Sequence, residues 1–444
     1  TPGPQELATE AFHALDKEVF IHYITMDGYT FHQMLRDPSA YGLSSSDVAM
    51  TWGEFTEDDT DRYRLECAAF LERLLAIPRA ELNERDQFSY DTMQQYLEDG
   101  AAENVFAYYY EPLTEYTGLH TNISLGLGLY KFSNEQDVID YLALLEDVPR
   151  YLGQVLAYEQ KRAELGMFMT EPALDAILAA CTDIIDARES FYLVATFNDG
   201  VDSLPEIDQE AAEAYKSRNE QVVKGPFIDA FQTLHDGLKA LRGECRSPEG
   251  LWALGETGTA YFEYAMQQEG NNLLTVEETV ELLMNELFYM WSLYIQCIIE
   301  DPDAYEEVDL TSGNAETDLA LLESLTNRLL FPLPEHTITL NAVPEELEGQ
   351  LSAAAYVIPP IDVWQENEVL INPAKPDNEL LMTLAHEAYP GHMFQYVYQR
   401  ALTDTGLTQR VLHYGAYAEG WSQTANYIIA ISQKCILRML QQDI

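Results

Sequence analysis

The chain has 444 residues, of which 47% are apolar, which is enough for a large buried core and excludes an intrinsically disordered protein. Lysine and arginine total 24 against 75 aspartates and glutamates, which gives a net charge of −51. A chain this acidic repels phosphate backbones and anionic lipid, so neither nucleic acids nor membrane surfaces are expected as partners. The five cysteines are far apart, which predicts neither a disulfide framework nor a cysteine zinc site.

Helical periodicity dominates the first three quarters of the chain. Apolar residues in 135–153 recur at the spacing of an amphipathic helix, and 205–241 continues this pattern. Thr275-Val276-Glu277-Glu278 is a capping box that predicts the start of a long helix through Ile299. Its nearly apolar stretch 287–299 is too short to cross a bilayer and predicts a core helix instead. A further helix is expected from Thr317 to Leu330.

Short strands are expected after Leu333. The ranges 337–340, 353–358 and 368–371 are apolar or β-branched and are bounded by Pro, Asn and Asp. An Asp or Asn at position 377 or 378 then caps a helix that leads directly into His386. The sequence therefore predicts a small β-sheet immediately before this helix.

The candidate chemistry lies in the heptapeptide His386-Glu387-Ala388-Tyr389-Pro390-Gly391-His392. It resembles H-E-x-x-H, in which two histidines one helical turn apart bind zinc and the glutamate is a general base. Here the second histidine follows six residues after the first, about 240° around a straight helix, so the two rings would point apart. Pro390 and Gly391 permit the helix to bend or end, which would return His392 to His386. The alternative is a helix that ends at Pro-Gly beside two unrelated histidines.

A third metal ligand is expected in the helix that follows. A catalytic zinc site uses three protein ligands and keeps one position open for water. Glu419 lies near the start of the helix predicted from about residue 414, and a turn near 403–408 would bring it back to the histidines. Its neighbours Tyr414, Tyr417 and Trp421 are large and tend to be buried, which argues against the alternative of a solvated surface glutamate.

These residues predict hydrolysis by water activated on one zinc ion, with His386, His392 and Glu419 as ligands. Glu387 is the expected general base, which takes the proton of the water and hands it to the leaving amine. A donor for the oxyanion is also needed. The candidates are Tyr389, Tyr414, Tyr417 and His413, and the alternative for each is a packing role.

Together with Gln395 and Glu419-Gly420-Trp421, the heptapeptide resembles the signature of the bacterial domain-of-unknown-function 885 family, which is placed near the helical zincin metallopeptidases. The resemblance implies a mainly α fold, a large helical zincin-like body with a deep cleft. It implies one zincin-like unit over 1–444, with 1–332 as the helical body and 333–444 as the small sheet and metal-binding helices, whose C-terminal part is incomplete. Met393 and Thr424 depart from the family pattern, which often has His and Tyr there.

The expected function is zinc-dependent hydrolysis of short peptides by an exopeptidase or oligopeptidase, because a deep channel excludes folded proteins. By analogy with zincins, we expect strand 368–372 to line the cleft and to pair with an extended substrate. The alternatives are a non-catalytic peptide- or metal-binding protein on the same scaffold, and hydrolysis of a non-peptide amide. The start without Met indicates processing and favours a secreted or surface-anchored bacterial protein, with a cytoplasmic one as the alternative. The sequence does not indicate the oligomeric state.

Overall fold

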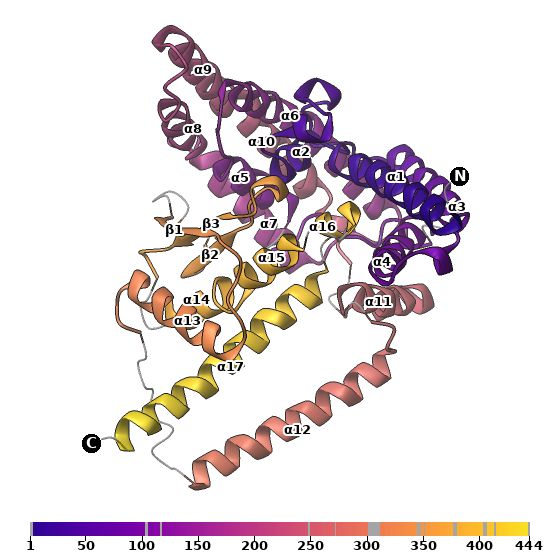
Figure 1. Cartoon of the computed structure of the whole chain (residues 1–444). Coiled ribbons are helices and arrows are strands. Elements are labelled where there is room, and N and C mark those ends of the chain that lie inside the picture. Colours follow the sequence, from indigo (N-terminus) through magenta and orange to yellow (C-terminus); the bar gives the residue numbers. More distant parts are fainter. Residues whose placement is uncertain are drawn as a thin grey trace. The chain divides into compact units, whose positions relative to one another are not determined.

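The computed structural model describes residues 3–442 except 103–104, 116–117, 247–248, 271, 301–310, 344–347, 350, 376–379, 403–405 and 413. For residues 297, 300 and 430–442 it describes the backbone alone. The chain forms two compact units, which are coloured along the sequence in Figure 1. Unit 1 consists of 1–253, 360–363 and 402–412, and unit 2 of 254–359, 364–401 and 413–444. The single unit expected over 1–444 stays a prediction.

Unit 1 is built from α-helices, as the periodicity predicts. Its helices are α1 (Pro4–Ile24), α2 (Gly28–Met34), α3 (Glu57–Leu75), α4 (Glu84–Ala101), α5 (Leu119–Gly128), α6 (Glu135–Glu164), α7 (Glu171–Asp186), α8 (Leu193–Asp202), α9 (Gln209–Val222), α10 (Ile228–Ala240) and α16 (Leu407–Val411). Shorter helical segments along the chain are η1 (Pro38–Tyr41), η2 (Ser45–Asp47), η3 (Arg79–Glu81), η4 (Val223–Phe227), η5 (Arg242–Glu244), η6 (Leu251–Leu254) and η9 (Ile361–Val363).

Helix α6 is the central element of unit 1. Its N-terminus is a capping box in which Asn134 and Asp137 each bind the other's backbone N–H, which satisfies two donors that the first turn leaves free. Its buried stripe includes Val138, Leu145 and Leu152, so the helix predicted from 135 is confirmed, and it extends to Glu164. The pattern predicted over 205–241 is interrupted at η4, where a proline at position 226 removes one backbone donor.

Unit 2 combines helices with the only sheet in the described part of the chain. Its elements are α11 (Gly255–Gly270), α12 (Val276–Glu300), α13 (Ala315–Leu329), β1 (Thr337–Ala342), β2 (Ala354–Val357), β3 (Glu366–Ile371), α14 (Leu380–Glu387), α15 (His392–Ala401) and α17 (Gly415–Gln442). The capping box at Thr275 and Glu278 is present, with each residue bonded to the other's backbone N–H. The prediction of a core helix is wrong for the described side chains of α12, because its large apolar residues between 280 and 299 are exposed.

The sheet has the strand order β1-β3-β2, in which β1 is parallel and β2 antiparallel to β3. All three predicted strands are therefore confirmed, but the expectation that strand 368–372 pairs with a substrate is wrong. This strand is β3, and both of its edges already pair with neighbours, so no backbone groups remain for a further strand. The sheet packs against α14 through β2, and α14 in turn packs against α13 (Figure 1).

Buried side chains from the sheet and four helices, α13, α14, α15 and α17, form the core of unit 2. They include Leu322 of α13, Val369 of β3, Leu384 of α14 and Phe394 of α15, all of which are almost inaccessible. This core holds the ends of α14 and α15, on which the two histidines lie. Along the described residues, no helix combines the length and the hydropathy needed to cross a bilayer.

Candidate metal centre

The helix that carries the heptapeptide is broken, as the spacing of its histidines predicts. Helix α14 ends at Glu387 and α15 begins at His392, with the Tyr389–Pro390 peptide bond in the cis form between them. A Cβ atom on Gly391 would lie 1.7 Å from the carbonyl oxygen of His386, so no side chain fits at this position. The glycine thus lets the backbone turn back next to the end of α14, and the centroids of the His386 and His392 rings lie 4.7 Å apart.

Glu419 lies with the two histidines, as predicted. It is in the first turns of α17, and its carboxylate oxygens lie 3.4 Å from Nε2 of His386 and 3.5 Å from Nε2 of His392. The three side chains each offer one ligand atom within 4.8 Å of the others. The histidines are largely buried, whereas the Glu419 side chain is 63% exposed, so solvent reaches the group from the side of the carboxylate.

Two contacts fix α17 against the break between α14 and α15. The indole Nε1 of Trp421 donates to the carbonyl oxygen of Pro390 at 2.7 Å, and Ser422 Oγ donates to the carbonyl oxygen of His386 at 3.1 Å. The Trp421 ring also stacks on Phe394 of α15. Because the last carbonyls of a helix lack partners in the helix, Ser422 satisfies one at the end of α14 and at the same time places Glu419. The sequence singled out Trp421 but gave no signal for Ser422.

The spacing of the three ligand atoms suits an ion better than direct hydrogen bonds. Charge-assisted N–H···O bonds are shorter, at about 2.7–2.9 Å. Around a tetrahedral ion with bonds of about 2.0–2.1 Å, two ligand atoms lie about 3.3 Å apart. Each histidine lies close to this distance from one oxygen of Glu419, His386 at 3.4 Å from Oε2 and His392 at 3.5 Å from Oε1. His386, His392 and Glu419 could therefore hold a metal ion, although the three residues do not identify which one.

Glu387 is positioned by the edge strand of the sheet. Its carboxylate accepts a hydrogen bond of 3.0 Å from the backbone N–H of Tyr356 in β2. Burial raises the pKa of Glu387 above the ordinary carboxyl value, while the Tyr356 N–H and the adjacent His386 act in the opposite direction. The strand beside Glu387 is thus β2, whereas the strand expected from the sequence to line the cleft was β3.

The tyrosines proposed as oxyanion donors differ in their surroundings. Tyr389 is buried, its hydroxyl lies 2.5 Å from Nε2 of His336, and burial raises its pKa. Tyr417 is 62% exposed on α17, two residues before Glu419, so its expected burial is wrong, and Tyr414 is half-buried just before that helix. His413 lies outside the described residues. The catalytic roles of these four residues stay predictions.

Tyr396 is a further residue of this region, and it was not among the residues predicted from the sequence. It lies one turn after His392 on α15, and residues four apart share one face of a helix. Burial raises its pKa, the Arg400 guanidinium lowers it, and the charge of Glu419 raises it. The spacing from His392 could have indicated it, whereas His336 lies 50 residues before the heptapeptide and left no local signal.

Comparisons with known proteins agree with the sequence pattern. The model of a family described as "Bacterial protein of unknown function (DUF885)" matches residues 38–289 and 304–429. A search of curated proteins gives no match. Among solved structures, the chain is similar to a crystal structure described as "the putative lipoprotein from Colwellia psychrerythraea", at 14% identity and a TM-score of 0.78. The similarity covers 96% of this chain and 78% of that one and shows a shared fold, while the relation to zincins and the deep cleft stay predictions.

Proposed function

This chain belongs to the DUF885 family of bacterial proteins, whose function is unknown, and from its residues we propose that it is a zinc-dependent peptidase that acts on short peptides. The observation that carries the proposal is the joint placement of two imidazoles, one carboxylate and a second, half-buried carboxylate, that of Glu387, next to a ligand. Two histidines and one glutamate are the ligand set of several catalytic zinc enzymes. A structural zinc site would instead use four protein ligands.

When held by these ligands, zinc would supply a bound water with a pKa near 7 and a Lewis acid for the scissile carbonyl. Glu387 is the base that accepts the proton of this water and delivers it to the leaving amine. One of its oxygens, Oε2, accepts the Tyr356 N–H, and the other is left to carry the proton. The same hydrogen bond fixes the direction in which that second oxygen points.

An extended peptide has a suitable partner in β2. This strand is an edge of the sheet, and its Tyr356 N–H is directed to Glu387 and is not used for pairing with β3. Backbone groups on this edge would hydrogen-bond to a peptide that runs past the base, which is β-augmentation. The oxyanion donor is a tyrosine near the ligands, and Tyr396 joins Tyr389, Tyr414 and Tyr417 as a candidate.

Export from the cell is part of the proposal. The structurally similar Colwellia protein is described as a "putative lipoprotein", which supports a location at the bacterial surface for this chain as well. A peptidase there would meet peptides from the surroundings.

The test is digestion of a mixture of synthetic peptides, with product mapping by mass spectrometry in the presence and absence of a chelator. Wild type is expected to cleave only without chelator. Glu387→Gln is expected to keep its metal and to lose activity by at least about 100-fold, as is typical when a general base is removed. The matched control is Glu366→Gln, which removes the same charge from an exposed position on β3 and should leave cleavage unchanged. Cleavage that survives the chelator or the Glu387→Gln change would refute the proposal, and bound metal without any cleavage would favour a binding protein.

A further inference from the structure

Unit 1 contains a cavity of about 930 Å³ that the proposed peptidase does not use. Three segments surround it: residues 54–64, which are the loop before α3 and the start of that helix, the turn 106–110 and the C-terminal half of α6. All of its lining residues belong to unit 1, whereas the three candidate metal ligands belong to unit 2. Its volume is in the range of small-molecule sites, which is about 300–1,000 Å³.

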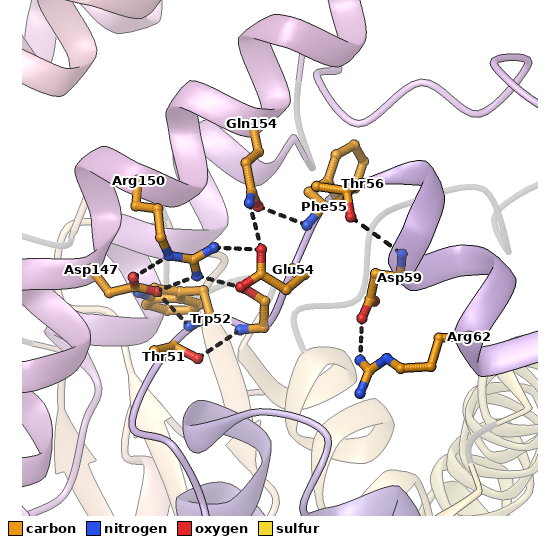
Figure 2. Close-up of polar contacts among 11 residues, drawn as sticks. Thr51, Trp52, Glu54, Phe55, Thr56, Asp59, Arg62, Asp147, Arg150 and Gln154 are labelled. Atoms are coloured by element: carbon orange, nitrogen blue, oxygen red, sulfur yellow. Dashed lines mark hydrogen bonds and ion pairs between the residues drawn. The ribbon is translucent and has the colours of Figure 1, made fainter. Parts of the chain in front are cut away.

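The first wall of the cavity, the loop 51–56, is joined to α6 by the hydrogen bonds that Figure 2 shows. Arg150 donates to Asp147 at 2.6 Å and to Glu54 at 2.9 Å. Gln154 accepts the backbone N–H of Phe55 at 2.8 Å and donates to Glu54. Asp147, Arg150 and Gln154 follow one face of the helix, so the loop 51–56 is fixed at several successive points. Because this loop is already held by hydrogen bonds, ordering it on ligand binding costs little conformational entropy.

The second wall is held in an unusual backbone conformation. Tyr108 has a φ of +67° and is the one residue other than glycine with a positive φ in the described ranges. Its carbonyl oxygen accepts a hydrogen bond of 2.9 Å from Arg162, which is 1% exposed and is paired with Glu159 and Glu111. A strained backbone conformation persists only where the surrounding structure holds it, and such residues cluster at binding and active sites.

Aromatic rings line much of the cavity. They are those of Phe55, Phe106, Tyr108, Tyr110 and Tyr158. The rings of Tyr108 and Tyr158 are stacked with centroids 5.0 Å apart, and Phe55 meets Tyr158 edge-on at 5.1 Å. The Tyr158 hydroxyl donates to the carbonyl oxygen of Tyr110, which fixes the ring between the two walls. The faces of such rings carry negative charge density and attract cations.

The charged residues of the lining favour the same kind of ligand. Four carboxylates line the cavity, those of Glu54, Glu57, Asp58 and Asp61, against two cations, Arg64 and Lys161. Both cations already have an anionic neighbour, because Lys161 lies 2.9 Å from Glu164 and Arg64 lies 3.5 Å from Asp61. Burial and a hydrogen bond to Glu57 raise the pKa of Tyr108 to about 12, so its ring stays neutral. The cavity therefore has an excess of negative charge beside aromatic faces.

We propose that this cavity binds a small organic cation with an alkylated ammonium group, which lies against the rings of Tyr108 and Tyr158 and faces Glu57. A metal ion does not fit as well, since hard ions need several converging oxygen ligands. Among the described residues, only the group in unit 2 converges in that way. An alkylated ammonium group has the charge for the carboxylates and the apolar surface for the rings.

The test uses the full chain and two probes that have the same shape. Choline and its neutral isostere 3,3-dimethylbutan-1-ol are titrated by calorimetry at about 0.15 M salt, where long-range attraction to the acidic chain is screened. Benzyltrimethylammonium is a larger second cation. We expect saturable binding of one cation per chain, and at least about tenfold weaker binding of the neutral isostere, which equals 1.4 kcal/mol.

Matched variants separate the cavity from the general charge of the chain. Glu57→Gln and Tyr158→Leu should each weaken cation binding about tenfold. Asp59→Asn removes the same charge from the same turn of α3, and Tyr109→Leu removes a ring from the same loop, but neither residue lines the cavity, so both should bind like wild type. Asp59 instead pairs with Arg62 (Figure 2). Circular dichroism shows which variants are folded.

Three results would overturn the proposal. The first is that neither cation binds saturably below about 10 mM, and the second is that the isostere binds as well as choline. The third is that a folded lining variant and its control lose affinity equally. The two lining variants are independent, so one that fails to fold leaves the other to decide. None of these results depends on peptidase activity or on metal in unit 2.

Discussion

Replacing Gly391 by alanine tests whether the close return of the chain creates the metal site. The new Cβ would lie 1.7 Å from the carbonyl oxygen of His386, and ordinary contact begins at 3.4 Å, so the turn must open by about 1.7 Å. Metal–ligand distances tolerate only about 0.2 Å. We therefore expect His392 to be lost as a ligand, zinc affinity to fall by more than about 100-fold, and stability to fall by about 1–3 kcal/mol through overpacking.

Gly420→Ala is the matched control, because it adds the same methyl group beside Glu419. A Cβ at this position meets no atom within 4 Å, and it lies inside α17. The change should leave zinc binding intact and stabilise the helix by about 0.5–1 kcal/mol. Zinc titration calorimetry and denaturant unfolding measure both quantities. If Gly391→Ala binds zinc as tightly as Gly420→Ala, the geometry of the break is not what creates the site.

Two further predictions concern the support of the site and the pH dependence of unit 1. Ser422→Ala removes the hydrogen bond to the His386 carbonyl. Zinc affinity should therefore fall about tenfold, and the free energy of unfolding should fall by about 1 kcal/mol. An unchanged zinc affinity in calorimetry would contradict the role of Ser422. Burial lowers the pKa of His120 to about 4, whereas the pKa of a histidine in the unfolded chain is near 6.5. The unfolded chain therefore binds a proton at this residue more readily than the folded one. The stability that depends on neutral His120 is complete above pH 6.5, and at most about 3 kcal/mol of it is lost as the pH falls towards 4. Urea unfolding at pH 7 and pH 5 should therefore show a smaller acid loss in His120→Leu than in wild type, and equal losses would refute the assignment.

Local signals in the sequence predicted much of the helical structure. The capping box at Thr275 and the apolar stripe after Asn134 act within a few residues of one another, and both helices begin as expected. The six-residue spacing of His386 and His392 also predicted the break at Gly391, because side chains six residues apart point in different directions on a regular helix. The position of Glu419 followed from the need for a third ligand.

Non-local contacts account for what the sequence did not predict. The order of the strands depends on pairing between distant segments, so the edge position of β2 and its contact with Glu387 left no pattern in the sequence. The apolar stretch of α12 gave the correct secondary structure, but periodicity does not tell what covers a helix, and the described side chains are exposed. The hydrogen bond between His336 and Tyr389 likewise joins residues 53 positions apart.

The most direct test of the metal centre is zinc titration of the purified, metal-free chain beside Glu419→Gln. Wild type should bind one zinc ion per chain. Glu419→Gln keeps the size of the side chain but removes the anionic ligand, so affinity should fall by at least about 100-fold, while Glu366→Gln should bind like wild type. A chain that binds no zinc, or a Glu419→Gln variant that binds it as tightly as wild type, would contradict the assignment of His386, His392 and Glu419.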